Sequence, residues 1–372
     1  MISNRKTPLD YAKMGADTLI RKFSIEDLPP KNRFHYHQGV FLSGMERIYM
    51  LSGEQKYYDY IKSWIDYFID ENGDIRYCDV REFDDMQPGI LLFNLYKTTH
   101  DERYKKVLDR FAPIVEMWPT NAQGGFWHKY HRQNQMWLDG LYMIGPYSAM
   151  YAHYFDKPYF YETIYQQMHL MRQNMTDPKT GLLYHAWDDS KTIDWADKKT
   201  GLSPEFWGRA VGWYAVAIMD ILDYIPPNHP RRQEFINAEL DIINALIRFQ
   251  DEETGLWFQV VDKGGRPENW RETSCSSLYI YAIAKGIKKG LLHQAYAKYI
   301  DRGYKGIIAS LTFEGDQLIV SNICIGTGVG DYDFYINRPT VRNDLHGMGA
   351  FLLMCTEYYD ACKQLGRTDY GE

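Results

Sequence analysis

Asp139 carries the clearest chemical signal in the sequence. It is the only charged residue in the apolar run 135–143, which leads into a predicted buried helix. A carboxylate in such surroundings is expected to have a raised pKa unless another group pairs with it, and a raised pKa suits a general acid that works near neutral pH. The alternative is that Asp139 is the N-cap of the helix, a position that favours aspartate for structural reasons.

Asp84 holds the equivalent place in an earlier part of the chain, within the segment 83–89. If the chain is built from repeated units, two acids at equivalent places in adjacent units would face each other across one mouth. A pair of this kind pushes its two pKa values apart. The pattern therefore predicts Asp139 and Asp84 as catalytic residues, with helix capping by Asp84 or Asp85 as the alternative.

Two histidines end loops of one type, in which a glycine is followed by apolar and aromatic residues. His128 ends the segment 125–128, and His185 ends the segment 181–185. A single histidine is more often a structural hydrogen-bonding residue than a catalyst. Because these two occupy matching places, we predict that both belong to a substrate-binding site.

A metal site is a further possibility at His35 and His37, which flank Tyr36. No acid or cysteine stands at ligand spacing beside them in the sequence, so we predict no metal and no other cofactor. The segment 326–330 has alternating glycines like a phosphate-binding loop. No strand, loop and helix unit surrounds it, so we interpret it as a flexible loop.

Trp207, Arg209 and Trp213 form the third candidate group. Two indole rings offer stacking surfaces for a sugar, and the guanidinium between them offers a planar fork for a carboxylate. The alternative is that Arg209 pairs with Glu205 or with another neighbouring acid. His346 stands at the corresponding place near the end of the chain.

A repeated pattern indicates how these residues are positioned. The glycine that opens each aromatic loop recurs at intervals of 52 to 74 residues, at Gly73, Gly125, Gly181, Gly255 and Gly315. A recurring unit of this length indicates a fold built from repeated structural units, so folds of this kind are considered before others. If the units close into a ring, their loops converge on one mouth.

The segments between the loops have helical periodicity. In 57–68 and 104–115 the apolar residues fall on one face. Six other segments are apolar on all sides and begin with small residues, near Gly39, Gly89, Gly140, Gly212, Ser276 and Gly347. A helix apolar on all sides is buried. We therefore predict an all-α fold, a single (α/α)6 barrel over residues 1–372, with the extra residues 185–208 forming a long loop over the mouth.

The composition excludes several classes of protein. The net charge of −7 argues against a nucleic-acid partner, and no run of 18 apolar residues indicates a membrane span. No export signal is visible, and five scattered cysteines indicate reduced thiols, so we expect a cytoplasmic protein. No obligatory protein partner is evident. Aromatic residues make up 16% of the chain, enough to line a sugar-binding cleft as well as a core.

Several segments together resemble a known family. They are 33–39, 125–128, 135–143, 184–187 and 203–209. These segments are similar to the unsaturated rhamnogalacturonyl hydrolases of glycoside hydrolase family 105, and the resemblance runs from about residue 8 to about residue 360. It implies an (α/α)6 barrel with Asp139 as catalytic acid and Asp84 as the second aspartate of the mouth. It also implies these substrate contacts: Tyr36, His128, His185, Trp207, Arg209 and Trp213.

The resemblance implies removal of the unsaturated galacturonyl residue that a pectin lyase leaves at the non-reducing end of a rhamnogalacturonan oligosaccharide. Ordinary glycosidases place two carboxylates about the glycosidic bond. Here an acid protonates C4 of the C4–C5 double bond and water adds at C5. The alternatives are an unsaturated glucuronyl hydrolase on other uronic oligosaccharides, or a sugar epimerase that uses His128 and His185 as its proton-transfer pair. A glycan-binding barrel without activity would not require Asp139 in its apolar setting.

Overall fold

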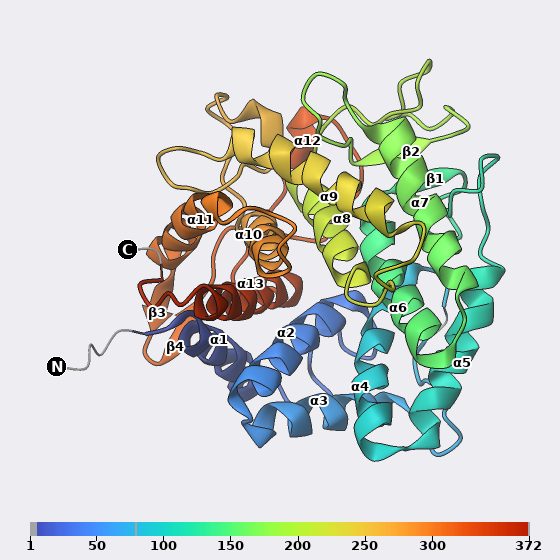
Figure 1. Cartoon of the computed structure of the whole chain (residues 1–372), viewed down its shortest axis with the longest axis vertical. Coiled ribbons are helices and arrows are strands. Elements are labelled where there is room, and N and C mark those ends of the chain that lie inside the picture. The colour runs from blue at the N-terminus through green and yellow to red at the C-terminus, as the bar shows by residue number, and fades with distance from the viewer. Residues whose placement is uncertain (1–5, 79, 371–372) are drawn as a thin grey trace.

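Helices make up most of the chain in its computed structural model, which describes residues 6–78 and 80–370 (Figure 1). The inner helices are α2 (Tyr36–Ser52), α4 (Ile90–Thr99), α6 (Asp139–Phe155), α8 (Gly208–Ile221), α10 (Thr273–Lys288) and α13 (Leu345–Gln364). The outer helices are α1 (Pro8–Lys22), α3 (Gln55–Phe68), α5 (Glu102–Glu116), α7 (Tyr159–Met175), α9 (Arg232–Leu246) and α11 (Ala297–Ser310). Within the described residues these helices form the predicted double ring.

Packing between helices follows the order of the chain until the ring closes. Each of α2, α4, α6, α8 and α10 packs against the outer helix that follows it. The last inner helix, α13, packs against both α2 and α10, and it takes α1 as its outer partner. Figure 1 shows α13 and α1 adjacent, so the two ends of the chain complete one hairpin.

Burial explains why the two rings differ in sequence. Along α8 every residue except Asp220 is buried, as expected for a helix that other helices surround. On α3 the buried residues are those of the apolar stripe that its helical periodicity predicts, namely Tyr57, Ile61, Trp64, Ile65 and Phe68. The inner helices thus form the core, and the outer helices cover it with one apolar face each.

The recurring glycines mark a sharp turn after each outer helix. Gly73, Gly181 and Gly255 have φ values of 75°, 73° and 75°, a left-handed conformation that glycine adopts without steric cost. In the second unit Gly124, with φ 87°, makes this turn in place of the predicted Gly125. The repeat in the sequence is therefore a repeat of backbone geometry.

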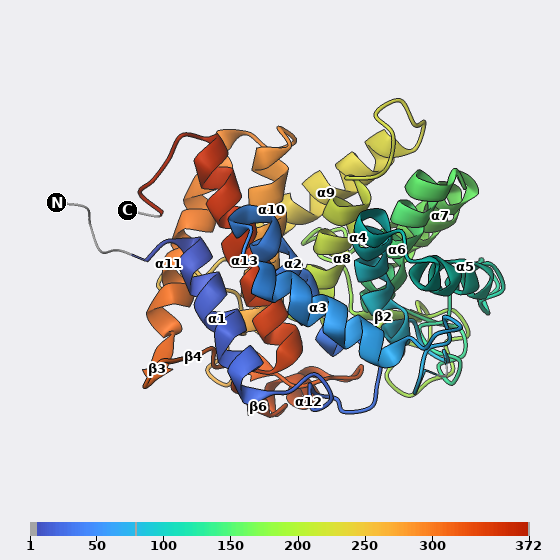
Figure 2. The same cartoon turned by 90° about the horizontal axis from the view of Figure 1, so that it is seen from below.

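Short elements complete the connections. The antiparallel pairs are β1 (Gln135–Trp137) with β2 (Ala186–Asp188), β3 (Thr312–Glu314) with β4 (Gln317–Ile319), and β5 (Ile323–Cys324) with β6 (Thr340–Val341). Short helical turns are η1 (Phe83–Asp85), η2 (Gln87–Gly89), η3 (Ile247–Phe249), η4 (Val261–Lys263), η5 (Gln294–Tyr296) and α12 (Tyr332–Ile336). In Figure 2 the connections that carry β6 and α12 lie along the lower edge of the barrel. None of the helices in the described residues is long and apolar enough to cross a membrane.

We predict that Gly349→Ala destabilises the barrel at its closure. A Cβ atom at Gly349 would lie 2.6 Å from the backbone nitrogen of Phe41, because α13 and α2 are in close contact there. Overpacking of this kind typically costs about 1–3 kcal/mol of unfolding free energy. Urea denaturation should show this loss, whereas Gly265→Ala should be close to neutral because no atom lies within 4 Å of a Cβ at that position. Equal stability of the two variants would contradict the prediction.

Candidate active site

A cleft of about 370 Å³ is formed where helices α2 and α6 begin. Its lining residues come from four parts of the chain: 33–37, 82–84, 128–143 and the loop 326–328. The N-terminal ends of α2 and α6 lie at this cleft, and the N-terminal end of a helix carries partial positive charge. The backbone therefore favours an anionic ligand here.

Asp139 is the first residue of α6 and lines the cleft with 9% of its surface exposed. The N-cap of α6 is Leu138, so Asp139 does not have the capping position that the sequence left open. Its Oδ2 atom lies 3.2 Å from Nε2 of His185. Burial opposes the charge on Asp139, but the hydrogen bond and charge of His185, together with His128, outweigh burial and lower the pKa of the carboxyl. The expectation of a raised pKa was therefore wrong for the unliganded protein, because the sequence did not reveal these partners.

His185 lies behind Asp139 and is fully buried. Its Nδ1 atom is 2.6 Å from the hydroxyl of Tyr335, on α12. The ring also packs against Trp207, with 4.7 Å between ring centroids. His185 is therefore held through Nδ1 and through its ring, its Nε2 faces Asp139, and it does not itself line the cleft.

Asp84 lines the same cleft from η1 and is also buried. Nζ of Lys129 donates a hydrogen bond of 2.8 Å to its Oδ2. Nε2 of His35 lies 3.8 Å from the same oxygen. The N-cap of η1 is Glu82, so Asp84 does not cap this turn. The structure thus brings Asp84 and Asp139 to one cleft, but it gives each carboxylate a different partner.

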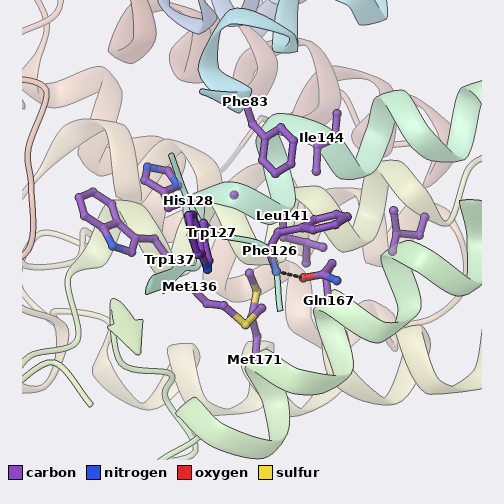
Figure 3. Close-up of a pocket in the computed structure, with 12 residues that line it drawn as sticks. Phe83, Phe126, Trp127, His128, Met136, Trp137, Leu141, Ile144, Gln167 and Met171 are labelled. Atoms are coloured by element: carbon purple, nitrogen blue, oxygen red, sulfur yellow. Dashed lines mark hydrogen bonds between the residues drawn. The ribbon is translucent and has the colours of Figure 1, made fainter. Parts of the chain in front are cut away.

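His128 lies in the cleft between the two aspartates and stacks on Trp137, with ring centroids 4.2 Å apart and planes 13° apart. Figure 3 shows the apolar pocket on one side of His128, with Phe83 and Phe126 among its walls. Burial lowers the pKa of His128 to about 4, even though the nearby Asp84 favours the charged form. His128 is therefore a neutral imidazole at neutral pH.

Tyr36 and Trp213 occupy different depths. Tyr36 lines the cleft at the start of α2. Trp213 is buried beneath it, stacked on Tyr142 with 4.4 Å between centroids and in edge contact with Tyr36 at 6.4 Å. The indole of Trp213 therefore supports the cleft from below in this structure.

Arg209 is buried, with 1% of its surface exposed, and its guanidinium lies over the ring of Trp207 at 4.5 Å. It donates hydrogen bonds to the carbonyl oxygens of Cys324 and Ile325, at 2.6 and 2.7 Å. The alternative pair with Glu205 is not formed, because Glu205 accepts from Lys263 instead. The guanidinium does lie 3.9 Å from the carboxylate of another acid, the buried Glu272. Arg209 thus fixes the chain just before the loop 326–328 of the cleft, and Trp207 is covered.

Several cleft residues were not predicted from the sequence. They are Arg33, Glu82, Lys129, His131, Arg132, Trp137 and Thr327. A usable signal existed for two of them, because Lys129 directly follows His128 and Trp137 lies two residues before Asp139. The other cleft residues lie in loops that meet in space although they are distant from one another in the sequence, so no local pattern marks them.

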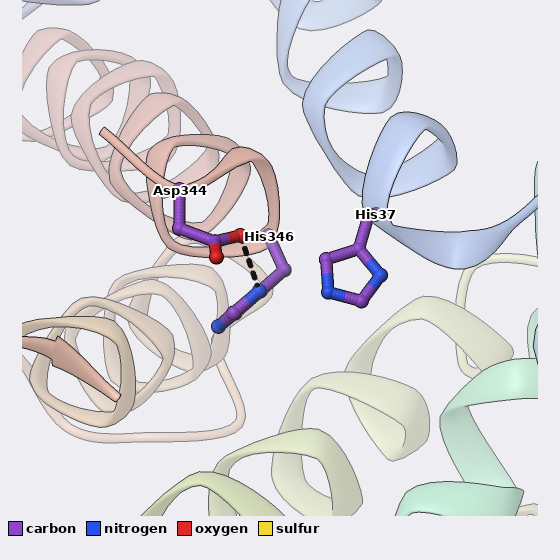
Figure 4. A group of neighbouring side chains, drawn as sticks. All are labelled: His37, Asp344 and His346. Carbon is purple, nitrogen blue, oxygen red and sulfur yellow. Dashed lines mark ion pairs between the residues drawn. The ribbon is translucent and has the colours of Figure 1, made fainter. Parts of the chain in front are cut away.

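His37 lies beside Asp344 and His346, so the expectation that no acid accompanies the two histidines was wrong for the folded chain (Figure 4). These three groups are arranged closely enough to bind a metal ion. Nδ1 of His346 lies 2.8 Å from Oδ1 of Asp344, however, and its Nε2 lies 3.0 Å from the carbonyl oxygen of Cys324. Both ring nitrogens of His346 therefore already face oxygen atoms of the protein.

A second group of possible metal ligands consists of His35, Glu82 and Asp84. Both of its carboxylates already pair with Lys129. Burial and the nearby Arg33 lower the pKa of His35 to about 3, so its ring is neutral. The positive charge on Lys129 therefore already faces the carboxylates of Glu82 and Asp84.

Comparison with known proteins identifies relatives along nearly the whole chain. Residues 11–362 match the family model described as Glycosyl Hydrolase Family 88. The chain is 26% identical to the unsaturated rhamnogalacturonyl hydrolase YesR of Bacillus subtilis, over 88% of this chain and 90% of that protein. A glycoside hydrolase of family 105 from C. acetobutylicum superposes with a TM-score of 0.89 at 35% identity, and the match covers 94% of this chain and 99% of that one. A possible family 105 member from Klebsiella pneumoniae has a TM-score of 0.77 at 26% identity, covering 88% and 82%.

We predict that His185→Leu raises the pKa of Asp139. Leucine cannot donate a hydrogen bond, so burial would no longer be opposed by the main partner of the carboxyl. The carboxyl should then titrate at a higher pH than in the parent. Carbon NMR of aspartate-labelled protein would follow this group, with Asp139→Asn to assign its signal. His153→Leu, on the exposed far end of α6, is the control, and an unchanged or lower midpoint in His185→Leu would contradict the prediction.

We also predict that Arg209→Ala lowers the stability of the protein. The substitution leaves two carbonyl oxygens without their donor, which should cost about 3 kcal/mol of unfolding free energy. Arg209→Lys should lose less, because it retains the charge and one bond. The control is Arg231→Ala, which removes only an exposed ion pair with Glu162 and should leave the stability close to that of the parent. Parental stability of Arg209→Ala in denaturant would show that this side chain does not hold the loop.

Proposed function

The chain belongs to Glycosyl Hydrolase Family 88, and from this premise we propose that it is an unsaturated uronyl glycoside hydrolase. We further propose that its substrate is a rhamnogalacturonan oligosaccharide with an unsaturated galacturonyl residue at the non-reducing end. The observation that carries the proposal is that Asp139 and Asp84 line one cleft together with His128 and Tyr36. The similarity to the unsaturated rhamnogalacturonyl hydrolase of Bacillus subtilis supports the choice of substrate.

The proposed reaction begins with the protonation of Asp139. In the free enzyme His185 holds the pKa of this carboxyl low, so Asp139 is ionised. The substrate brings its own carboxylate into the cleft, and a nearby like charge raises the pKa of a carboxyl. Binding of the substrate therefore favours the protonated form, which can act as a general acid.

Protonated Asp139 then donates its proton to C4 of the double bond, and the positive charge that develops at C5 is shared with the ring oxygen. The Asp139 carboxylate takes a proton from the water that attacks C5, so the carboxyl is again protonated, and it releases this proton when the products leave. The product at C5 is a hemiketal, which opens to a ketone as the bond between C5 and the ring oxygen breaks. The former ring oxygen remains on C1 as a hydroxyl, so C1 becomes a hemiacetal carbon. Its bond to the glycosidic oxygen then breaks, which leaves an aldehyde at C1 and releases the next sugar as an alcohol.

Neighbouring groups have supporting roles in the proposed reaction. Asp84, paired with Lys129, is placed to accept hydrogen bonds from sugar hydroxyls in the cleft. His128 is neutral, so it can orient a hydroxyl without adding charge beside Asp139. A sugar epimerase would need His128 and His185 to face one substrate, but His185 is fully buried behind Asp139. The geometry therefore favours hydrolysis over epimerisation.

We predict that Asp139→Asn reduces the rate by a factor of about 10²–10⁴, because general acid and base assistance is removed. The assay follows the loss of ultraviolet absorbance from the double bond in unsaturated galacturonyl oligosaccharides, with unsaturated glucuronyl oligosaccharides as the comparison. Faster turnover of the glucuronyl compounds would favour the alternative substrate class.

The matched control is Asp85→Asn. Asp85 does not line the cleft, and Arg33, with which it pairs, keeps its second pair with Glu82 in this variant. This variant should keep most of the activity. An Asp139→Asn enzyme within tenfold of the parent would rule out the proposed role of Asp139.

A further inference from the structure

Three long cationic side chains line the cleft, and they differ in their partners. Arg33 and Lys129 both reach Glu82, at 2.6 and 2.5 Å, and each also pairs with an aspartate. Arg132 has no hydrogen bond or ion pair from its side chain to any other residue within 6–78 and 80–370. Its Nε atom is buried and lacks a partner. Arg132 is thus the cleft cation, among the described residues, whose charge the protein does not neutralise.

The position of Arg132 is fixed before any ligand binds. Its backbone lies in a tight turn, in which its N–H donates to the carbonyl of Lys129 at 2.8 Å and its own carbonyl accepts from Gln135 at 3.2 Å. The guanidinium lies 5.8 Å from the centre of the Trp137 ring, which stacks on His128 as Figure 3 shows. Nε1 of Trp137 donates to the side chain of Gln135, so the ring itself is anchored. A guanidinium held in this way loses little entropy when it binds an anion.

We propose that Arg132 binds a carboxylate of the oligosaccharide and thereby makes the enzyme selective for uronic acid chains. The proposal rests on the proposed function, which supplies a substrate with carboxylates. A guanidinium forms two parallel hydrogen bonds to a carboxylate, and one buried donor of Arg132 is still unpaired. Two carboxylates could fill this place: that of the unsaturated residue itself, or that of the galacturonate two residues further along the chain.

Binding and turnover are measured with two substrates, the unsaturated disaccharide and the unsaturated tetrasaccharide. The disaccharide has only the carboxylate of the unsaturated residue, whereas the tetrasaccharide has the second one as well. Arg132→Gln should raise KM by about tenfold to a hundredfold, with kcat within a few-fold, because a contact made equally in ground and transition states changes mainly KM. Arg132→Lys should recover part of the loss. Gln133→Ala, an exposed position in the same turn, is the control with parental KM.

A rise in KM for both substrates assigns Arg132 to the carboxylate of the unsaturated residue, and a rise for the tetrasaccharide alone assigns it to the second uronate. Methyl esterification of the assigned carboxylate should then abolish the difference between Arg132→Gln and the parent. Unchanged KM for both substrates, or a fall in kcat alone, would overturn the proposal. If the parent turns over neither substrate, that result contradicts the proposed function and does not by itself test the role of Arg132. Calorimetry of both oligosaccharides with the parent and Arg132→Gln then still decides the binding role, since equal Kd values, or no binding to the parent, overturn it.

Discussion

Closure of the ring between α13 and α2 is the constraint on which the site depends. The absence of a side chain at Gly349 lets α13 approach the backbone at Phe41 closely, and α1 covers the outside of this joint. The same contact brings His37, from the start of α2, beside His346, from the start of α13. A looser joint would separate these histidines and release the loop that follows Cys324, whose carbonyl oxygen lies at hydrogen-bonding distance from His346.

Burial at the mouth sets the charge states of the cleft, because each ionisable group there depends on its nearest partner. Burial, together with Lys129 and His185, lowers the pKa of His128, whereas His185, 3.2 Å from Asp139, lowers the pKa of that carboxyl against the effect of its burial. His185 in turn is held by Tyr335 from a segment 150 residues further along the chain. The acid of the proposed reaction is therefore tuned by residues that do not line the cleft. In the proposed reaction, the charge of the substrate then determines when Asp139 takes up a proton.

Much of the architecture could be predicted from local patterns. Apolar residues at helical spacing mark the buried face of α3, and runs that are apolar on all sides mark inner helices such as α8. The recurring glycines predict equivalent turns, although Gly124 makes the second turn in place of Gly125. Asp139 was recognisable because a lone charge in an apolar run is costly unless it is used or paired. These features depend on residues close together in the sequence.

The partners of the charged groups, by contrast, could not be predicted from the sequence, because they come from distant segments of the chain. The sequence predicted a raised pKa for Asp139, and the fold lowers it by placing His185 against the carboxyl. Arg209 was expected to pair with Glu205 or another neighbouring acid, or to reach the cleft. It lies 3.9 Å from the carboxylate of Glu272 and donates to the carbonyl oxygen of Cys324, 115 residues away. Periodicity determines which face of a helix is buried, because burial depends on neighbours along the chain. The sign of a pKa shift depends instead on which side chains from distant segments approach within a few ångströms, and only ring closure determines that.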